Sequence, residues 1–453
     1  MRSDSSATRS FAVSFRCPPW LAAGLLLMAA LALSREAAAQ DTSAPNASDP
    51  AAKAALLIEK PLIDEKMEEI PFQTQLGRYS TAVRRGNLKD DGDLLRKGIR
   101  WRVRRMTLPK HRNDLPERRR DILLRDLGSA ASAEPNKEKA LEFRKFMLQT
   151  FLDEAKLLLD NNYHVRLNAT IFISQLSLAE PDRVTGQGEQ AFTPIAPVLL
   201  PLLGDPTQPV PVQIWAAKGL SRVLRTGEPD DELRHRVATR IIAELTDKPQ
   251  AHYWYQARLV EALGGAKLLH FGADKSFVVD ALAKVMVDRD RHPLVRSEAA
   301  KQLGRVPLDG TVNMELIVFG LADLTRELVL KQIAEPQATY WPSCFFGVYL
   351  AYRPLNRQEE QQQAGLLLKV RQQNDLQKYQ ATVEASFDLL VLKEPRIVPT
   401  AMRQPQGVAL DPALADPIGK WLGQSKPTDL RISPGLAPLI INADVAARPD
   451  PAS

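Results

Sequence analysis

The chain has 453 residues, more than one compact core usually holds, so we expect several domains or an elongated array. Its 60 Lys and Arg outnumber its 54 Asp and Glu, which gives a formal net charge of +6. Of its two cysteines, Cys17 lies in a predicted export signal and Cys344 remains alone, which excludes an internal disulfide in the mature chain.

The first elements in chain order are an export signal and a linker. Arginines precede a 14-residue apolar run, Trp20–Leu33, and the small residues Ala37 and Ala39 follow it. This pattern predicts a secretory signal peptide over 1–39, because the apolar run is too short for a membrane span; an uncleaved anchor is the alternative. We therefore expect a secreted or periplasmic protein without a further membrane segment, and a flexible linker over 40–60.

Residues 61–135 are predicted to form a basic, mostly helical segment. Within it, residues 78–125 carry 16 Lys and Arg against 6 Asp and Glu, so the remaining mature chain is net acidic. The densest cluster contains Arg100, Trp101, Arg102, Arg104, Arg105, Arg118, Arg119 and Arg120. Clustered arginines beside an aromatic ring favour an anionic partner, either polysaccharide or nucleic acid. The alternative is a helix face that pairs with the chain's own acidic groups.

Residues 136–393 contain a repeated pattern. Apolar anchors recur with spacings of 47, 43 and 40 residues, at Val165, Val212, Tyr255 and Val295. A polar residue follows each anchor directly, namely Arg166, Gln213, Gln256 and Arg296, and alanine stands four residues after three of the anchors. A unit of 40–47 residues with two helical stripes predicts an all-α fold built as an α-solenoid of helix pairs.

The best copy of this pattern is "VRSEAAKQLG", which begins at Val295, and it resembles the HEAT repeat family over about 140–306. The resemblance implies that the second helix of each HEAT-like pair lines a concave face. It also implies that the residue after the anchor bonds an Asp in an adjoining turn. For Arg296 this partner would be Asp288 or Asp290, and for Arg166 it would be Asp160.

Two aromatic residues of the third unit, Tyr253 and Trp254, are candidate contacts for a partner on the concave face. The alternative is that they fill gaps between helices. After the repeats, frequent proline predicts a Pro-rich, irregular C-terminal tail over 394–453 with one short helix.

No nucleophile–base, metal-ligand or phosphate-loop motif follows the signal, so we predict no catalytic, cofactor-binding or metal-binding residue and no cofactor. His252 and His292 precede repeat anchors and are interpreted as turn or cap residues, and Cys344 as a buried hydrophobic residue. The expected function is an exported, non-catalytic scaffold that binds an unidentified protein or an extended polymer. The alternatives are an anionic-polymer binder that uses the arginine cluster and an enzyme of unknown class.

Overall fold

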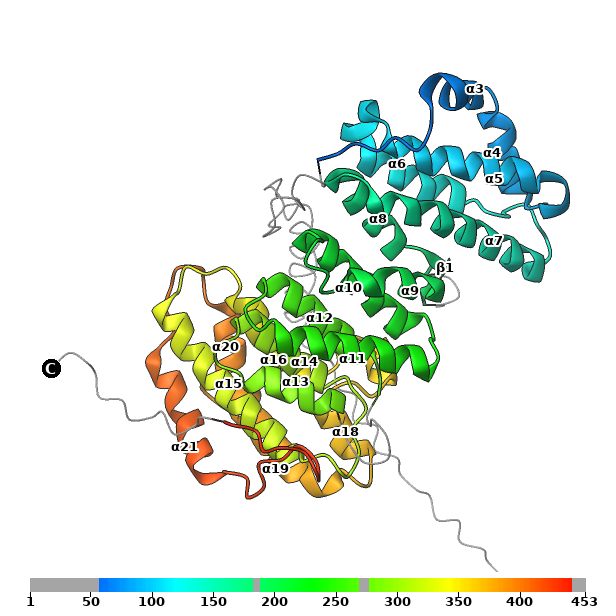
Figure 1. Cartoon of the computed structure of the whole chain (residues 1–453). Coiled ribbons are helices and arrows are strands. Elements are labelled where there is room, and N and C mark those ends of the chain that lie inside the picture. The colour runs from blue at the N-terminus through cyan, green and yellow to red at the C-terminus, as the bar shows by residue number, and fades with distance from the viewer. Residues whose placement is uncertain (1–56, 182–187, 269–276, 442–453) are drawn as a thin grey trace, which may run out of the picture. The chain divides into compact units, whose positions relative to one another are not determined.

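The computed structural model describes residues 57–181, 188–268 and 277–441 (Figure 1). The predicted signal peptide and most of the predicted linker lie outside the described residues. In the described ranges the chain is mostly helical, and the only strands there are β1 (Ser177–Ala179) and β2 (Gln190–Ala191), which pair antiparallel. The all-α prediction is therefore confirmed.

The basic segment contains helices of three kinds. Its α-helices are α3 (Ile70–Gln73), α4 (Leu76–Arg85), α5 (Leu88–Arg104) and α6 (Leu115–Asp121). Its other turns are the π-helices η1 (Glu65–Glu69) and η4 (Ile122–Leu127) and the 3-10 helices η2 (Arg105–Thr107) and η3 (Pro109–Asp114).

The turn between α4 and α5 follows directly from local chemistry. Helix α4 ends at Gly86, whose φ of 74° is the left-handed conformation that glycine adopts without strain. The side chain of Asn87 then caps α5 by accepting hydrogen bonds from two backbone amides of its first turn. Helix α5 buries the stripe of Leu95, Ile99 and Val103, which lie four residues apart on one face.

The repeat region begins with α7 (Lys137–Lys156), η5 (Leu157–Asp160) and α8 (Tyr163–Ser174). It continues with η6 (Thr193–Ile195), α9 (Ala196–Leu199), η7 (Leu200–Leu202), α10 (Val210–Thr226), α11 (Asp231–Asp247), α12 (Tyr253–Gly265), α13 (Phe277–Val287) and α14 (Pro293–Leu303). Its last elements are α15 (Met314–Ala334), α16 (Trp341–Tyr352), α17 (Arg357–Gln361), α18 (Leu366–Gln372), η8 (Gln377–Tyr379), α19 (Gln380–Phe387) and η9 (Asp388–Leu392).

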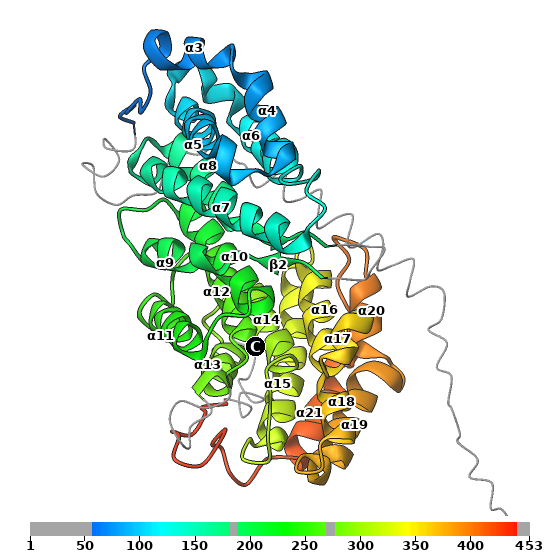
Figure 2. The same cartoon turned by 90° about the vertical axis from the view of Figure 1, so that its right-hand side faces the viewer.

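Helices that are far apart in the sequence pack side by side in a fixed order. Helix α8 contacts α10, α10 contacts α12, α12 contacts α14, and α14 contacts α16. Each of α8, α12, α14 and α16 also contacts the helix before it, respectively α7, α11, α13 and α15 (Figure 2). The second helices of the predicted pairs therefore form one continuous layer, with the first helices against them.

Small residues allow this close packing. Ala169, Ala216 and Ala299, the alanines four residues after the anchors, are all buried. A Cβ on Gly304 would lie 2.3 Å from the backbone oxygen of Ala351, so α14 and α16 approach closely enough there to exclude any side chain. Close interaxial approach of this kind needs small residues at the contact.

The polar residues after the anchors bond the turns, but not in the expected way. The expected pairing of Arg296 with Asp288 or Asp290 is wrong. The buried guanidinium group of Arg296 lies 2.7 Å from the carboxylate of Glu327 on α15, and its Nε donates to the Met286 carbonyl. Asp288 is already engaged by Arg291, another buried arginine, at 2.9 Å, so the Arg296 guanidinium group pairs with the less exposed carboxylate of Glu327.

The other positions after the anchors use neutral acceptors. The Gln213 side chain donates to two backbone carbonyls of the turn before α10, and Gln256 does the same before α12. Arg166 donates to the side chain of Gln208 at 3.1 Å, whereas Asp160 pairs with Lys60. The residue after each anchor therefore bonds a neighbouring turn to its helix, and in these three units the acceptor is not an aspartate side chain.

The tail differs from the expectation of one short helix. It contains α20 (Ile397–Arg403), η10 (Pro412–Ala415) and α21 (Asp416–Gln424), and α20 packs on α16 while α21 packs on α15. Proline occupies the first turns of η10 and α21, where a missing amide hydrogen costs nothing. Among the described residues, no helix has the length and apolarity that crossing a membrane requires.

Candidate functional site

The basic segment contains a pocket of about 390 Å³, which we call the arginine pocket. Its walls come from α4, α5, η2, α6 and η4. Five arginines line it, namely Arg84, Arg102, Arg105, Arg118 and Arg125. Only two acidic residues, Asp121 and Asp126, stand among its lining residues, so the wall carries an excess of positive charge.

The structure divides the predicted arginine cluster into two groups. Arg102, Arg105 and Arg118 line the arginine pocket, and the other five residues do not. Trp101 is buried and its indole nitrogen donates to the backbone oxygen of Glu69 at 3.0 Å. Its ring also lies under the guanidinium group of Arg105, 4.2 Å from the ring centre, so it supports a pocket residue without lining the pocket itself.

The remaining arginines of the cluster lie on other faces. Arg104 pairs with Glu154 on α7 at 2.7 Å, and Arg100 reaches the same carboxylate at 3.5 Å. Arg119 donates to the side-chain oxygen of Asn168 on α8 at 2.8 Å, and Arg120 is exposed. Three of these four therefore join the basic segment to the first helices of the repeat region.

Helical periodicity explains the division and is the signal that would have found the pocket. Arg100 and Arg104 are four residues apart and share one face of α5, whereas Arg102 and Arg105 are three apart and share another. The predicted cluster omitted two pocket residues, Arg125 and Arg84. Arg125 lies seven residues after Arg118, a spacing that places two residues on the same face of a helix. Arg84 ends a stripe on α4 that faces them.

Asp126 is the buried acid of the pocket. Its carboxylate accepts a hydrogen bond from Arg102 at 3.0 Å and another from the hydroxyl of Tyr79 at 3.2 Å. Burial raises the pKa of Asp126 to about 6, and the attraction of Arg102 offsets this only in part. The pocket therefore loses a negative charge when the pH falls through about 6.

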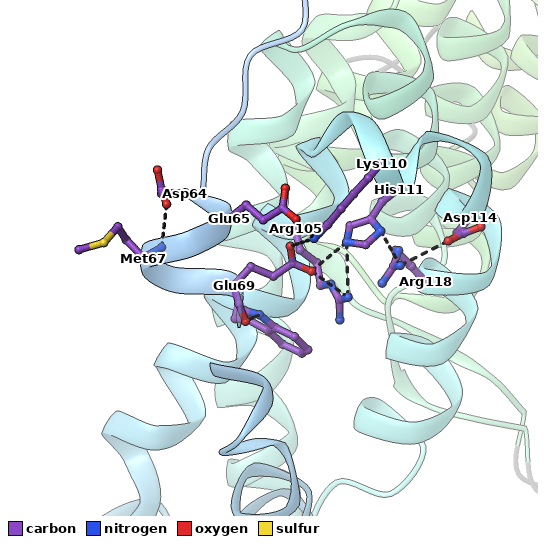
Figure 3. Close-up of polar contacts among 10 residues, drawn as sticks. Asp64, Glu65, Met67, Glu69, Arg105, Lys110, His111, Asp114 and Arg118 are labelled. Atoms are coloured by element: carbon purple, nitrogen blue, oxygen red, sulfur yellow. Dashed lines mark hydrogen bonds and ion pairs between the residues drawn. The ribbon is translucent and has the colours of Figure 1, made fainter. Parts of the chain in front are cut away.

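A second group of contacts centres on the carboxylate of Glu69 (Figure 3). Arg105, Lys110 and His111, from η2 and η3, point toward its carboxylate and lie 3.0, 2.7 and 2.9 Å from it. Burial raises the pKa of Glu69, but the hydrogen bonds from Lys110 and His111 and the charge of Arg105 outweigh it, so the pKa is lowered overall. Glu69 therefore stays ionised and holds Arg105 in place.

His111 joins Glu69 to Arg118. Its Nδ1 lies 2.6 Å from a terminal nitrogen of Arg118, and its Nε2 lies 2.9 Å from the Glu69 carboxylate. Because arginine only donates, Nδ1 is the acceptor and Nε2–H donates to Glu69. Burial and the neighbouring arginines lower the pKa of His111, which favours this neutral form. Both ring nitrogens are occupied, so His111 orients Arg118 and has no nitrogen available to act as a base.

A second candidate surface runs across the N-terminal ends of α12, α14 and α16. We call it the aromatic row: His252, Tyr253, Trp254, His292 and Tyr340. The Tyr253 ring stacks between His252 and His292, at centroid distances of 4.7 and 4.2 Å, and Tyr340 meets His292 edge-on at 4.6 Å. Trp254 lies beside Tyr253 and is 39% exposed. The row thus spans three successive helices, and its predicted members Tyr253 and Trp254 stand at one end of it.

The two histidines are helix caps, as predicted. The Nδ1 atoms of His252 and His292 each accept a hydrogen bond at 3.2 Å from the backbone amide two residues later. Burial lowers the pKa of both, so both rings are neutral at neutral pH. In the part of the chain that the structure describes, no group of three His, Cys, Asp or Glu residues is placed to hold a metal ion. Cys344 is fully buried, as predicted, and burial raises the pKa of its thiol to about 12.

Comparisons with models of protein families, with curated proteins and with solved structures give no match for this chain.

Proposed function

We propose that this chain is an exported, non-catalytic α-solenoid of HEAT-like helix pairs that binds a partner protein through the aromatic row. The exported location rests on the predicted signal peptide. The solenoid rests on the repeat of 40–47 residues in the sequence and on the unbroken succession of contacts from α8 to α16.

The observation that carries the binding role is the continuity of the aromatic row. His252, His292 and Tyr340 are the N-cap residues of three neighbouring helices, and Tyr253 fills the space between the first two. Tyrosine and tryptophan are enriched at protein interfaces because they bury large areas at a small cost in side-chain entropy. A row held by ring stacking presents its exposed edge in one fixed arrangement before any partner arrives.

Affinity capture from the exported fraction of the source cells tests this function. The bait is the mature chain, used as wild type, as a Tyr253→Ala/Trp254→Ala double variant and as Leu141→Ala. Leu141 is a matched control because it is 42% exposed and lies on α7, which contributes nothing to the row. Truncation of residues that dominate an interface costs about 2 kcal/mol or more, which is roughly 30-fold in affinity.

We expect at least one protein that the wild type and Leu141→Ala retain equally and that the double variant loses. Circular dichroism melts of all three baits serve as the control for folding. If the double variant retains the same proteins in the same amounts as the wild type, the aromatic row is not the binding surface and the proposed function fails.

A further inference from the structure

We propose that the arginine pocket binds a small organic phosphate monoester, a function separate from the binding of a partner protein. The pocket is lined by five arginines and two aspartates, and it belongs entirely to the basic segment.

The arginines of the pocket are not matched one to one by acids. Asp126 is engaged by Arg102, and Asp121 lies 3.4 Å from the largely exposed Arg125. Asp114 lies 3.4 Å from Arg118, and Glu69 must serve Lys110 and His111 as well as Arg105. Arg84 is exposed and has no acidic partner among the described residues. By contrast, Arg104, which lies outside the pocket, forms an ion pair with the carboxylate of Glu154 at 2.7 Å.

Arg105 is repelled by the other pocket arginines. Burial and the positive charges of Arg118 and Arg102 together lower the pKa of Arg105 to about 10, against the opposing effect of Glu69. Guanidinium groups brought together in this way favour an anion placed between them, because it removes the repulsion and supplies the missing counter-charge.

Hydrogen-bond donors of the same arginines are unused. The Nε atoms of Arg105 and Arg118 are shielded from solvent and meet no acceptor within the described ranges. Arg105 uses one terminal nitrogen on Glu69, and Arg118 uses one on both His111 and Asp114, so the second terminal nitrogen of each is available to a ligand. A fork with two parallel donors matches the oxygens of a phosphate group better than any other side chain does.

The arginines are also held in position before a ligand arrives. Glu69 fixes Arg105, and the neutral His111, itself oriented by Glu69, fixes Arg118 (Figure 3). Trp101 lies under Arg105 and limits its movement from below. Binding therefore needs little ordering of long side chains, which is the main entropic cost of recognition by arginine.

The size and the remaining walls favour an organic molecule over a bare ion. A volume of about 390 Å³ falls in the range of small-molecule pockets, which is roughly 300–1,000 Å³. The apolar residues Leu76, Val83 and Ile122 also line the space. A phosphate monoester carries two negative charges above its second pKa of about 6 and an organic group that such a wall can cover.

Calorimetric titration of the mature chain at about pH 7.5 and physiological salt tests the proposal. The probes are phenyl phosphate, inorganic phosphate, phenyl sulfate and phenol. We expect saturable, one-to-one binding of phenyl phosphate. Inorganic phosphate lacks the apolar group and phenyl sulfate carries a single charge, so we expect both to bind more weakly, and phenol not to bind.

Two pairs of variants separate the pocket from general positive charge. Arg84→Gln and Arg118→Gln remove lining arginines, whereas Arg85→Gln and Arg120→Gln remove exposed arginines of the same two helices that do not line the pocket. All four lower the net charge equally. We expect about tenfold or greater loss of affinity for phenyl phosphate in each lining variant, and less than about twofold in each control.

Equal losses in the lining and control variants would show diffuse attraction and overturn the proposal. So would the absence of saturable phenyl phosphate binding in the wild type, or equal affinity for phenyl sulfate. Arg84 is exposed, so its replacement leaves the fold intact and carries the test if Arg118→Gln unfolds, which circular dichroism would reveal.

Discussion

Gly98→Ala tests whether α4 and α5 approach as closely as the structure shows. A Cβ at position 98 would lie 2.1 and 2.4 Å from two ring carbons of Tyr79 on α4, where contact normally begins above 3 Å. The ring has no room to retreat, because Tyr79 is fully buried and its hydroxyl donates to Asp126 in the arginine pocket. The added methyl group must therefore push the two helices apart.

The expected cost is at the upper end of the range for overpacking, about 1–3 kcal/mol, since three ring atoms lie within 2.8 Å of the new atom. Replacing glycine by alanine within a helix returns about 1 kcal/mol, so the net destabilisation is about 1–2 kcal/mol. Gly92→Ala in the same helix is the matched control. Its new Cβ meets only the end of the Arg96 side chain at 3.8 Å, so we expect a gain of about 0.5–1 kcal/mol.

Hydrogen exchange followed by mass spectrometry measures this locally, in peptides from α4 and α5. We expect exchange there to be about 5- to 30-fold faster in Gly98→Ala and slower than wild type in Gly92→Ala. If Gly98→Ala slows exchange as Gly92→Ala does, the close contact between the helices does not exist, and the position of Asp126 in the pocket loses its support.

Four further predictions follow from buried residues. Ala299→Phe should lower stability by about 1–3 kcal/mol, measured by urea denaturation, because Ala299 is fully buried in the layer of second helices. Glu327→Gln should cost about 3–5 kcal/mol, because it leaves the guanidinium group of Arg296 buried without a counter-charge, whereas Glu315→Gln on the exposed side of α15 should be neutral. Cys344 should resist Ellman's reagent at about pH 8 until the chain unfolds, and labelling of the native protein would contradict its burial. Asp126, whose pKa is raised, contributes stability that is complete below its unfolded pKa of about 4 and is lost as the pH rises through about 6; Asp126→Asn should remove this part of the pH dependence in melts at pH 4 to 7.

The local pattern of the repeats was sufficient to predict their helices. The stripe from Val295 to Leu303 became α14, and the alanines at its fourth position are buried because every second helix has neighbours on two sides. The caps at His252 and His292 were predictable for the same reason, since each immediately precedes a helix whose free amides need an acceptor. Features that depend only on spacing along one helix can be predicted from the local sequence.

Partners from distant elements were not predictable in this way. Nothing near Arg296 in the sequence indicates that its counter-charge is Glu327, which lies on the next long helix. Likewise nothing in the acidic stretch around Glu69 distinguishes it from Glu68, yet three cationic or histidine side chains from η2 and η3 converge on Glu69. Such contacts are set by how helices cross, and a single sequence carries no direct record of crossing angles.

The pocket illustrates how a cluster that is compact in sequence becomes two clusters in space. The prediction of one patch from Arg100 to Arg105 considered only their closeness in the sequence. A helix turns by 100° per residue, so alternate arginines lie on different faces. On one face Arg100 and Arg104 meet Glu154 and fasten the basic segment to α7.

On the other face the balance of charge differs. Arg105 shares Glu69 with Lys110 and His111, and the charges of Arg102 and Arg118 repel it across the pocket. A purely structural role needs only matched pairs, as Arg104 and Glu154 demonstrate. Bringing additional guanidinium groups together raises the free energy of the folded chain, because like charges repel and buried donors lose water. The excess of arginine is therefore unexplained by packing alone, and a bound dianion would supply the missing partner.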